Sequence, residues 1–87
     1  MLSLVFKMRV SEKQLEGKTY YSVPKAAGKL QVPAQKLRTI LKNGWLNENE
    51  IDTNERDVMK DTLSNQIYIN SELVDKMREK IYVPVLD

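Results

Sequence analysis

Neither cysteine nor histidine occurs among the 87 residues. Without cysteine the chain can form no disulfide, hold no metal through thiolates and use no cysteine nucleophile, and it suits a reducing compartment. Without histidine it lacks the commonest general base and the commonest zinc ligand. The remaining carboxylates, hydroxyls and lysines have neither the spacing of a catalytic site nor that of a calcium loop. The sequence therefore predicts a protein that is not an enzyme, with no catalytic residues, no metal site and no cofactor.

Aromatic residues and long apolar runs are also scarce. Aromatic side chains make up 7% of the chain, so the core must come mainly from Leu, Val, Ile, Met and Ala. No apolar run approaches the roughly 20 residues that cross a bilayer, and the N-terminal "MLSLVF" lacks the length and basic region of a signal peptide. We therefore expect a cytoplasmic protein with no membrane partner. The length corresponds to one small domain, and its thin core leaves a homodimer as an open alternative.

Charge is divided unevenly along the chain. Residues 1–46 carry nine lysines and arginines against two acids, a net charge of +7, whereas residues 47–87 carry five against ten, a net charge of −5. The overall net charge of +2 hides this asymmetry. Unequal halves of this kind indicate that one part faces a polyanion while the other has a different task.

Both ends of the chain have the pattern of β-strands. Apolar residues alternate over residues 2–10, which predicts a strand with one buried face. The C-terminal "IYVPVLD", residues 81–87, has the pattern of an edge strand, because Pro84 cannot donate a ladder hydrogen bond. Residues 11–14 have the composition of a capped helical turn, and Gly17 is placed to end it.

Two short amphipathic helices follow in the cationic half. Ser22 is a good N-cap for a helix over residues 24–30, which has a proline in its first turn. A second helix begins near Pro33 and ends at residues 43–44, where glycine suits a left-handed cap. The positions expected to face the core are Ala26, Ala27, Leu30, Leu37, Ile40 and Leu41.

The acidic segment, residues 47–66, is harder to interpret. Within it, "TNERDVMKDTLSN", residues 53–65, can form a short helix or the two legs of a long hairpin, and the sequence leaves both alternatives open. The following "QIYI", residues 66–69, predicts a strand. Asn70 and Ser71 then cap a final helix over residues 72–81.

Two helices joined by a tight turn, the second one cationic, form the helix-turn-helix pattern. The helices must cross closely, which requires a small residue at their contact, and Ala27 supplies it. The outer side of the second helix is then polar: Arg and Lys can reach phosphates or guanine, and Gln can pair with adenine. The side chains expected to contact DNA are Lys25, Lys29, Gln35, Lys36, Arg38, Thr39 and Lys42.

Residues 21–46, "YSVPKAAGKLQVPAQKLRTILKNGWL", resemble the MerR-like and excisionase-type winged helix-turn-helix family. The shared features are an aromatic-hydroxyl-Val opening, an Ala-containing helix, Leu-x-Val, Leu-Arg and a closing Gly-x-Leu. Residues 65–81, "NQIYINSELVDKMREKI", are similar to the strand and closing helix that follow the family's wing. Together the two pieces cover roughly half of the chain. The resemblance implies that Lys36, Arg38 and their neighbours meet DNA.

The same resemblance implies a fold class and a domain organisation. The whole chain, 1–87, would be a single α+β domain, a small winged helix-turn-helix domain with flanking N- and C-terminal β-strands. The helix-turn-helix would occupy about 21–46, a long acidic wing or loop about 47–66, and a closing strand and helix about 67–81.

The expected function is binding of double-stranded DNA by a helix placed in the major groove. The protein would act as a transcription regulator or as a recombination directionality (excisionase-like) factor, encoded by a phage or mobile element. If about half a dozen cations reach phosphates, affinity should fall about 10³-fold between roughly 50 and 200 mM salt. The alternative is a phage-type protein-interaction module, an inhibitor or antirepressor, that binds a basic partner protein through acidic segment 47–66.

Overall fold

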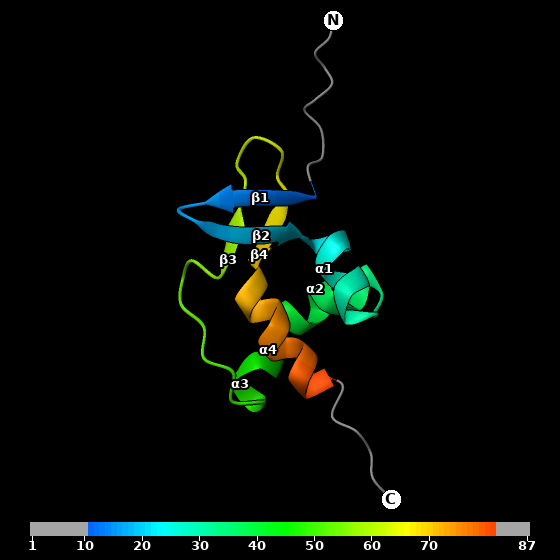
Figure 1. The fold of residues 1–87 in the computed structure, drawn as a ribbon. Helices are drawn as coiled ribbons and strands as arrows, with labels where there is room; N and C mark the ends of the chain where they lie inside the picture. The colour runs from blue at the N-terminus through cyan, green and yellow to red at the C-terminus, as the bar shows by residue number, and fades with distance from the viewer. Residues whose placement is uncertain (1–10, 82–87) are drawn as a thin grey trace, which may run out of the picture.

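The computed structural model describes residues 11–81 as a small α+β domain with four helices and one four-stranded antiparallel sheet (Figure 1). The strand order in the sheet is β1-β2-β4-β3. The elements in chain order are β1 (Glu12–Leu15), β2 (Lys18–Ser22), α1 (Val23–Leu30), α2 (Ala34–Lys42), α3 (Trp45–Glu48), β3 (Val58–Lys60), β4 (Ile67–Asn70) and α4 (Ser71–Ile81). The strands expected over residues 2–10 and 82–87 lie outside the described residues.

The helical turn expected at residues 11–14 is wrong, because most of that segment belongs to strand β1. Leu15 lies opposite Lys18, so only two residues connect β1 to β2. Those two residues, Glu16 and Gly17, both have positive φ, 53° and 79°. Positive φ at both central positions is the mark of the type I′ turn, whose twist matches that of paired strands. The local capping pattern is outweighed by strand pairing, which satisfies the backbone hydrogen bonds of the whole segment.

Helix α1 confirms the expected capping. The backbone N–H of Lys25 donates to Ser22 Oγ at 3.3 Å, and Pro24 stands in the first turn, where a missing N–H costs nothing. The helix ends at Gln31, which adopts the left-handed conformation with φ of 57°. Its N–H bonds back to the Gly28 carbonyl, which closes the turn before α2.

Helix α2 begins after Pro33, which occupies the N-cap position and offers no side-chain acceptor. The expected C-terminus is confirmed: Asn43 caps the helix and Gly44 follows with φ of 85°. The chain then forms the short helix α3, which is packed beside α2. Trp45 and Leu46 pack against the core, each half-buried.

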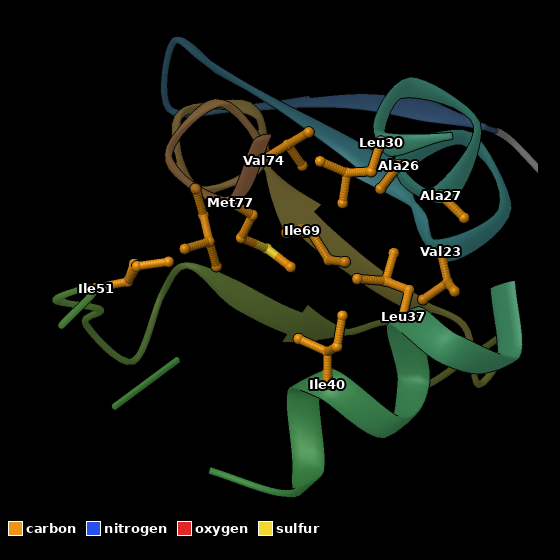
Figure 2. Close-up of a cluster of buried hydrophobic side chains, with 11 residues drawn as sticks. Val23, Ala26, Ala27, Leu30, Leu37, Ile40, Ile51, Ile69, Val74 and Met77 are labelled. Carbon is orange, nitrogen blue, oxygen red and sulfur yellow. The ribbon is translucent and has the colours of Figure 1, made fainter. Parts of the chain in front are cut away.

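The core lies between the helices and one face of the sheet (Figure 2). Helix α1 packs against α2 and α4, and both α1 and α4 contact β2 and β4. The sheet face toward the helices carries Tyr21, Val58 and Ile69, which are cross-strand neighbours. The expected inward positions of α1 and α2 are buried, apart from Leu41, which is half-buried. The buried core cluster consists of Val23, Ala26, Ala27, Leu30, Leu37, Ile40, Ile51, Ile69, Leu73, Val74 and Met77.

Of the two alternatives for residues 53–65, the structure shows part of the hairpin: β3 is one leg, and the other leg is β4, the strand expected at residues 66–69. Strands β3 and β4 pair antiparallel, and residues 61–66 connect them. On the sheet face away from the helices, Tyr20 and Tyr68 are both only 3% exposed. The Tyr20 hydroxyl donates to the Arg56 carbonyl at 2.8 Å, and the Tyr68 hydroxyl donates to Gln66 Oε1 at 2.7 Å. Tyr20 therefore ties the backbone just before β3 to β2, and Tyr68 fixes the side chain of Gln66 just before β4.

Candidate nucleic-acid interface

The central part of the chain carries charge of one sign. From Lys18 to Asn47 the sequence holds six lysines and arginines and no acid. Strand β2 and helices α1, α2 and most of α3 are made from this stretch. The parts of α1 and α2 that face solvent therefore carry no carboxylate of their own. A surface of this kind attracts polyanions.

The outer face of α2 follows from the residues that α2 buries. Leu37 and Ile40 are buried against the core, 0% and 4% exposed. The 3.6-residue period then directs the positions between them to solvent. The outer face of α2 consists of Gln35, Lys36, Arg38, Thr39 and Lys42, and all five are exposed. The structure thus places five of the seven residues expected to contact DNA on one accessible helix surface.

The three cations on this face are not neutralised by neighbours. Within residues 11–81, no carboxylate forms an ion pair with Lys36, Arg38 or Lys42. The Thr39 hydroxyl donates to the Gln35 carbonyl at 3.1 Å, so its donor is used inside the helix. Cations without a protein partner are available to phosphates, because no existing ion pair has to be broken first.

The two α1 lysines are placed differently. Lys25 Nζ lies 3.3 Å from a carboxylate oxygen of Glu12, and its side chain is 36% exposed. The ammonium groups of Lys25 and Lys29 lie 5.8 and 5.0 Å from the centroid of the Tyr21 ring. Cation–π contacts at these distances orient both lysines along the start of α1. Lys25 would have to leave Glu12 to bind a phosphate, whereas Lys29 keeps its cation exposed.

A shallow cleft of about 130 Å³ brings α2 next to the β3–β4 hairpin. Arg38 of α2, Asn65 and Gln66 of the hairpin and the first residues of α1 all line it. The sequence pattern did not identify Asn65 and Gln66 as neighbours of the interface. The available signal was the turn dipeptide Ser64-Asn65, where Asn65 takes a left-handed φ of 66°. A turn signal locates a loop, but it does not say which helix the loop approaches.

The tip of this hairpin, residues 61–66, is less acidic than the composition of residues 47–66 indicates. Its one carboxylate, Asp61, lies 2.7 Å from Lys13 Nζ. The Lys13 ammonium, together with the backbone N–H of Leu63, lowers the pKa of Asp61 from 3.8 to about 2. The remaining tip residues are uncharged. The hairpin tip therefore carries a compensated charge and can approach a polyanion.

The other acids of residues 47–66 lie away from the tip. Asp57 Oδ2 accepts a hydrogen bond from the Asn54 N–H at 3.0 Å, which is a local turn contact. Glu48, Glu50 and Asp52 lie at the end of α3 and in the loop after it, and all three are exposed. The acidic segment is therefore divided among α3, the loop after it and the hairpin.

Comparison with protein-family models, with curated proteins and with solved structures finds no match. In the part of the chain that the structure describes, no group of three or more Asp, Glu, His or Cys residues is arranged to hold a metal ion. Within residues 11–81, no helix combines the length and the apolar character needed to cross a lipid bilayer. Functional interpretation therefore rests on the geometry and charge of the α1, α2 and hairpin surface.

Proposed function

We propose that this protein binds double-stranded DNA with α2 in the major groove. The observation that carries the proposal is the outer face of α2, where three exposed cations have no carboxylate partner within residues 11–81. In this reading α1 and α2 form a helix-turn-helix, and the β3–β4 hairpin is the wing of a winged helix-turn-helix domain. The compact α1–turn–α2 unit, with Ala27 buried in the core cluster, supports it.

The roles of the individual side chains follow from their chemistry. Gln35 lies in the first turn of α2, and its amide can pair with an adenine edge. Arg38 can bind guanine bidentately or clamp a phosphate beside the hairpin. Lys36 and Lys42 reach phosphates, and Lys29, with Lys25 once it leaves Glu12, adds contacts from α1. Thr39 packs its methyl group toward the bases, because its donor is already used.

This mode of binding suits a cytoplasmic transcription regulator or a recombination directionality factor of the excisionase type. Both act by occupying or reshaping a DNA site, which needs a groove-reading helix and phosphate clamps but no catalytic residue. A homodimer would place two copies of α2 on half-sites about one helical turn apart.

A mobility-shift experiment with a random-sequence duplex at roughly 50 mM salt tests the proposal, because non-specific binding is strongest at low salt. We expect the wild type to bind, and the double variant Lys36→Ala/Arg38→Ala to bind at least about tenfold more weakly. The matched control is Lys76→Ala/Lys80→Ala, which removes the same charge from exposed positions of α4. Those lysines lie beside Glu50 and Asp52, so the control should keep wild-type affinity. Equal losses of affinity in the two variants would mean that binding depends on net charge alone and not on the face of α2.

The alternative, a protein-interaction module, is favoured by one observation. Glu48, Glu50 and Asp52 are exposed and form no ion pair within residues 11–81, so they are available to a basic partner protein. Reversing these three charges would then abolish capture of that partner, and the α2 double variant would behave as the wild type. Under the DNA-binding proposal, the charge reversal leaves the mobility shift intact.

A further inference from the structure

One apolar side chain is unusually exposed. Among residues 11–81, the large hydrophobic side chains that are exposed are Leu15, at 39%, and Leu63, at 97%. Leu63 stands in the middle of the hairpin tip, residues 61–66, and almost its whole surface meets solvent. A leucine that contributes nothing to the core of its own domain is available for a contact outside it.

The backbone that carries Leu63 is held in place on both sides. The Leu63 N–H donates to Asp61 Oδ1 at 2.9 Å, and the Asn65 N–H donates to the Asp61 carbonyl at 2.7 Å. The Asp61 N–H in turn donates to the Gln66 carbonyl at 2.8 Å, and Lys13 holds the Asp61 carboxylate from strand β1. An ordered loop presents its apolar residue at low entropic cost, which is the condition for insertion into a partner.

The position of the tip relative to α2 limits the kinds of partner that Leu63 can contact. Asn65 and Gln66 share a cleft with Arg38, so the tip lies beside the outer face of α2. With α2 in a major groove, a loop at its flank reaches the adjacent backbone and minor groove. Thr62, Ser64 and Asn65 around the leucine are uncharged hydrogen-bonding residues, and the only carboxylate, Asp61, is compensated by Lys13. The tip therefore carries no uncompensated negative charge that would repel phosphates.

We infer that Leu63 is a wedge that enters a base step from the minor groove and bends the DNA. This inference rests on the proposed DNA binding and adds a mechanical role to it. Apolar side chains inserted from the minor groove partly unstack a base step and kink the duplex toward the major groove. A kink in that direction would bend the DNA away from the face that carries the hairpin tip. A single leucine supplies far too little surface for a stable protein interface, which needs about 800 Å² from each partner, so a narrow insertion fits it better than docking.

Ring closure of a short DNA fragment measures bending without knowledge of the binding site. A random-sequence fragment of about 150 base pairs, one persistence length, closes slowly with DNA ligase unless a protein bends it. At protein concentrations that saturate the mobility shift of each variant, we expect the wild type to accelerate closure at least about tenfold. Leu63→Ser should lose this acceleration while still shifting the fragment, and Leu63→Met should keep it, because methionine also acts as a wedge.

The control is Leu15→Ser, which removes the other exposed leucine of residues 11–81, and this variant should bend DNA as the wild type does. A wild type that shifts DNA but does not accelerate closure, or a Leu63→Ser variant that accelerates it equally, would overturn the wedge and leave DNA binding standing. A wild type that does not shift random DNA at low salt would overturn DNA binding itself. Sedimentation without DNA that shows a dimer dependent on Leu63 would assign the leucine to self-association and overturn the wedge.

Discussion

At the residue scale, Asp61 shows how one carboxylate can order a loop while a neighbouring ammonium compensates its negative charge. It accepts hydrogen bonds from Lys13, 48 positions earlier in the chain, and from the N–H of Leu63. The local half of this arrangement, an Asp at the start of a turn, is visible in the sequence. The pairing with Lys13 cannot be predicted from the sequence, because no local pattern connects Lys13 to Asp61. For the same reason the sequence indicates only a long acidic wing or loop over residues 47–66, whereas the structure has a hairpin tip with compensated charge.

The Asp61 contact makes stability depend on pH in acid. The folded pKa, about 2, is below the ordinary value of 3.8, so the folded state favours the ionised carboxylate. The resulting stabilisation is complete above about pH 4 and is lost as the pH falls toward 2. We expect Asp61→Asn to be less stable than the wild type at pH 6, with the gap closing between pH 4 and 2. Urea unfolding at several pH values measures the gap.

The control for that experiment is Asp52→Asn, which removes an exposed carboxylate that has no ion pair within residues 11–81. It should show no comparable gap at pH 6. A stability difference for Asp61→Asn that stays constant from pH 6 to 2 would contradict the role of the ionised carboxylate and point to a packing effect.

At the element scale, helices were more predictable from the sequence than strands. Ser22, Ala27, Leu37 and Ile40 take the expected cap and core positions because a helix depends mainly on neighbours three and four residues away. Strand β1 was mistaken for a helical turn because its partner strand, not its own residues, determines its conformation. The two-residue turn after β1, Glu16-Gly17, is the sequence signal for a β-hairpin, because a glycine follows a polar residue there.

Two glycines give opposite predictions for the same substitution. Gly17, with φ of 79°, has no atom within 4 Å of an added Cβ, so alanine there costs only backbone strain. We expect Gly17→Ala to lower the free energy of unfolding by about 1 kcal/mol. Gly28 lies inside α1, also in open space, and Gly28→Ala should raise the free energy of unfolding by about 0.5–1 kcal/mol.

Urea denaturation of the two variants beside the wild type measures both changes. The pair controls for the added methyl group, because the same atoms are introduced at two exposed positions that differ in backbone conformation. Changes of the same sign in the two variants would contradict the type I′ turn between β1 and β2.

At the scale of the whole molecule, the α+β class agrees with the sequence pattern, but the arrangement of the sheet does not follow from it. The order β1-β2-β4-β3 joins strands from the two ends of the described chain, and β2 and β4 are separated by three helices. Pairings over such distances depend on the assembled core. The charge division follows the elements of the chain: the acid-free stretch forms α1 and α2, and the exposed acids Glu48, Glu50 and Asp52 come after α2.

This division predicts the salt dependence of DNA binding. Five cations on α1 and α2 can reach phosphates once Lys25 leaves Glu12: Lys25, Lys29, Lys36, Arg38 and Lys42. If all five bind phosphates, log affinity should fall with log salt with a slope of about −4.5, because each contact releases about 0.9 counterions. The Lys36→Ala/Arg38→Ala variant should have a slope of about −2.7, and the α4 control should keep the wild-type slope. Fluorescence anisotropy of a labelled duplex across a salt series measures the three slopes. A slope near zero for the wild type would contradict phosphate binding, and an unchanged slope for the α2 variant would place the phosphate contacts on another surface.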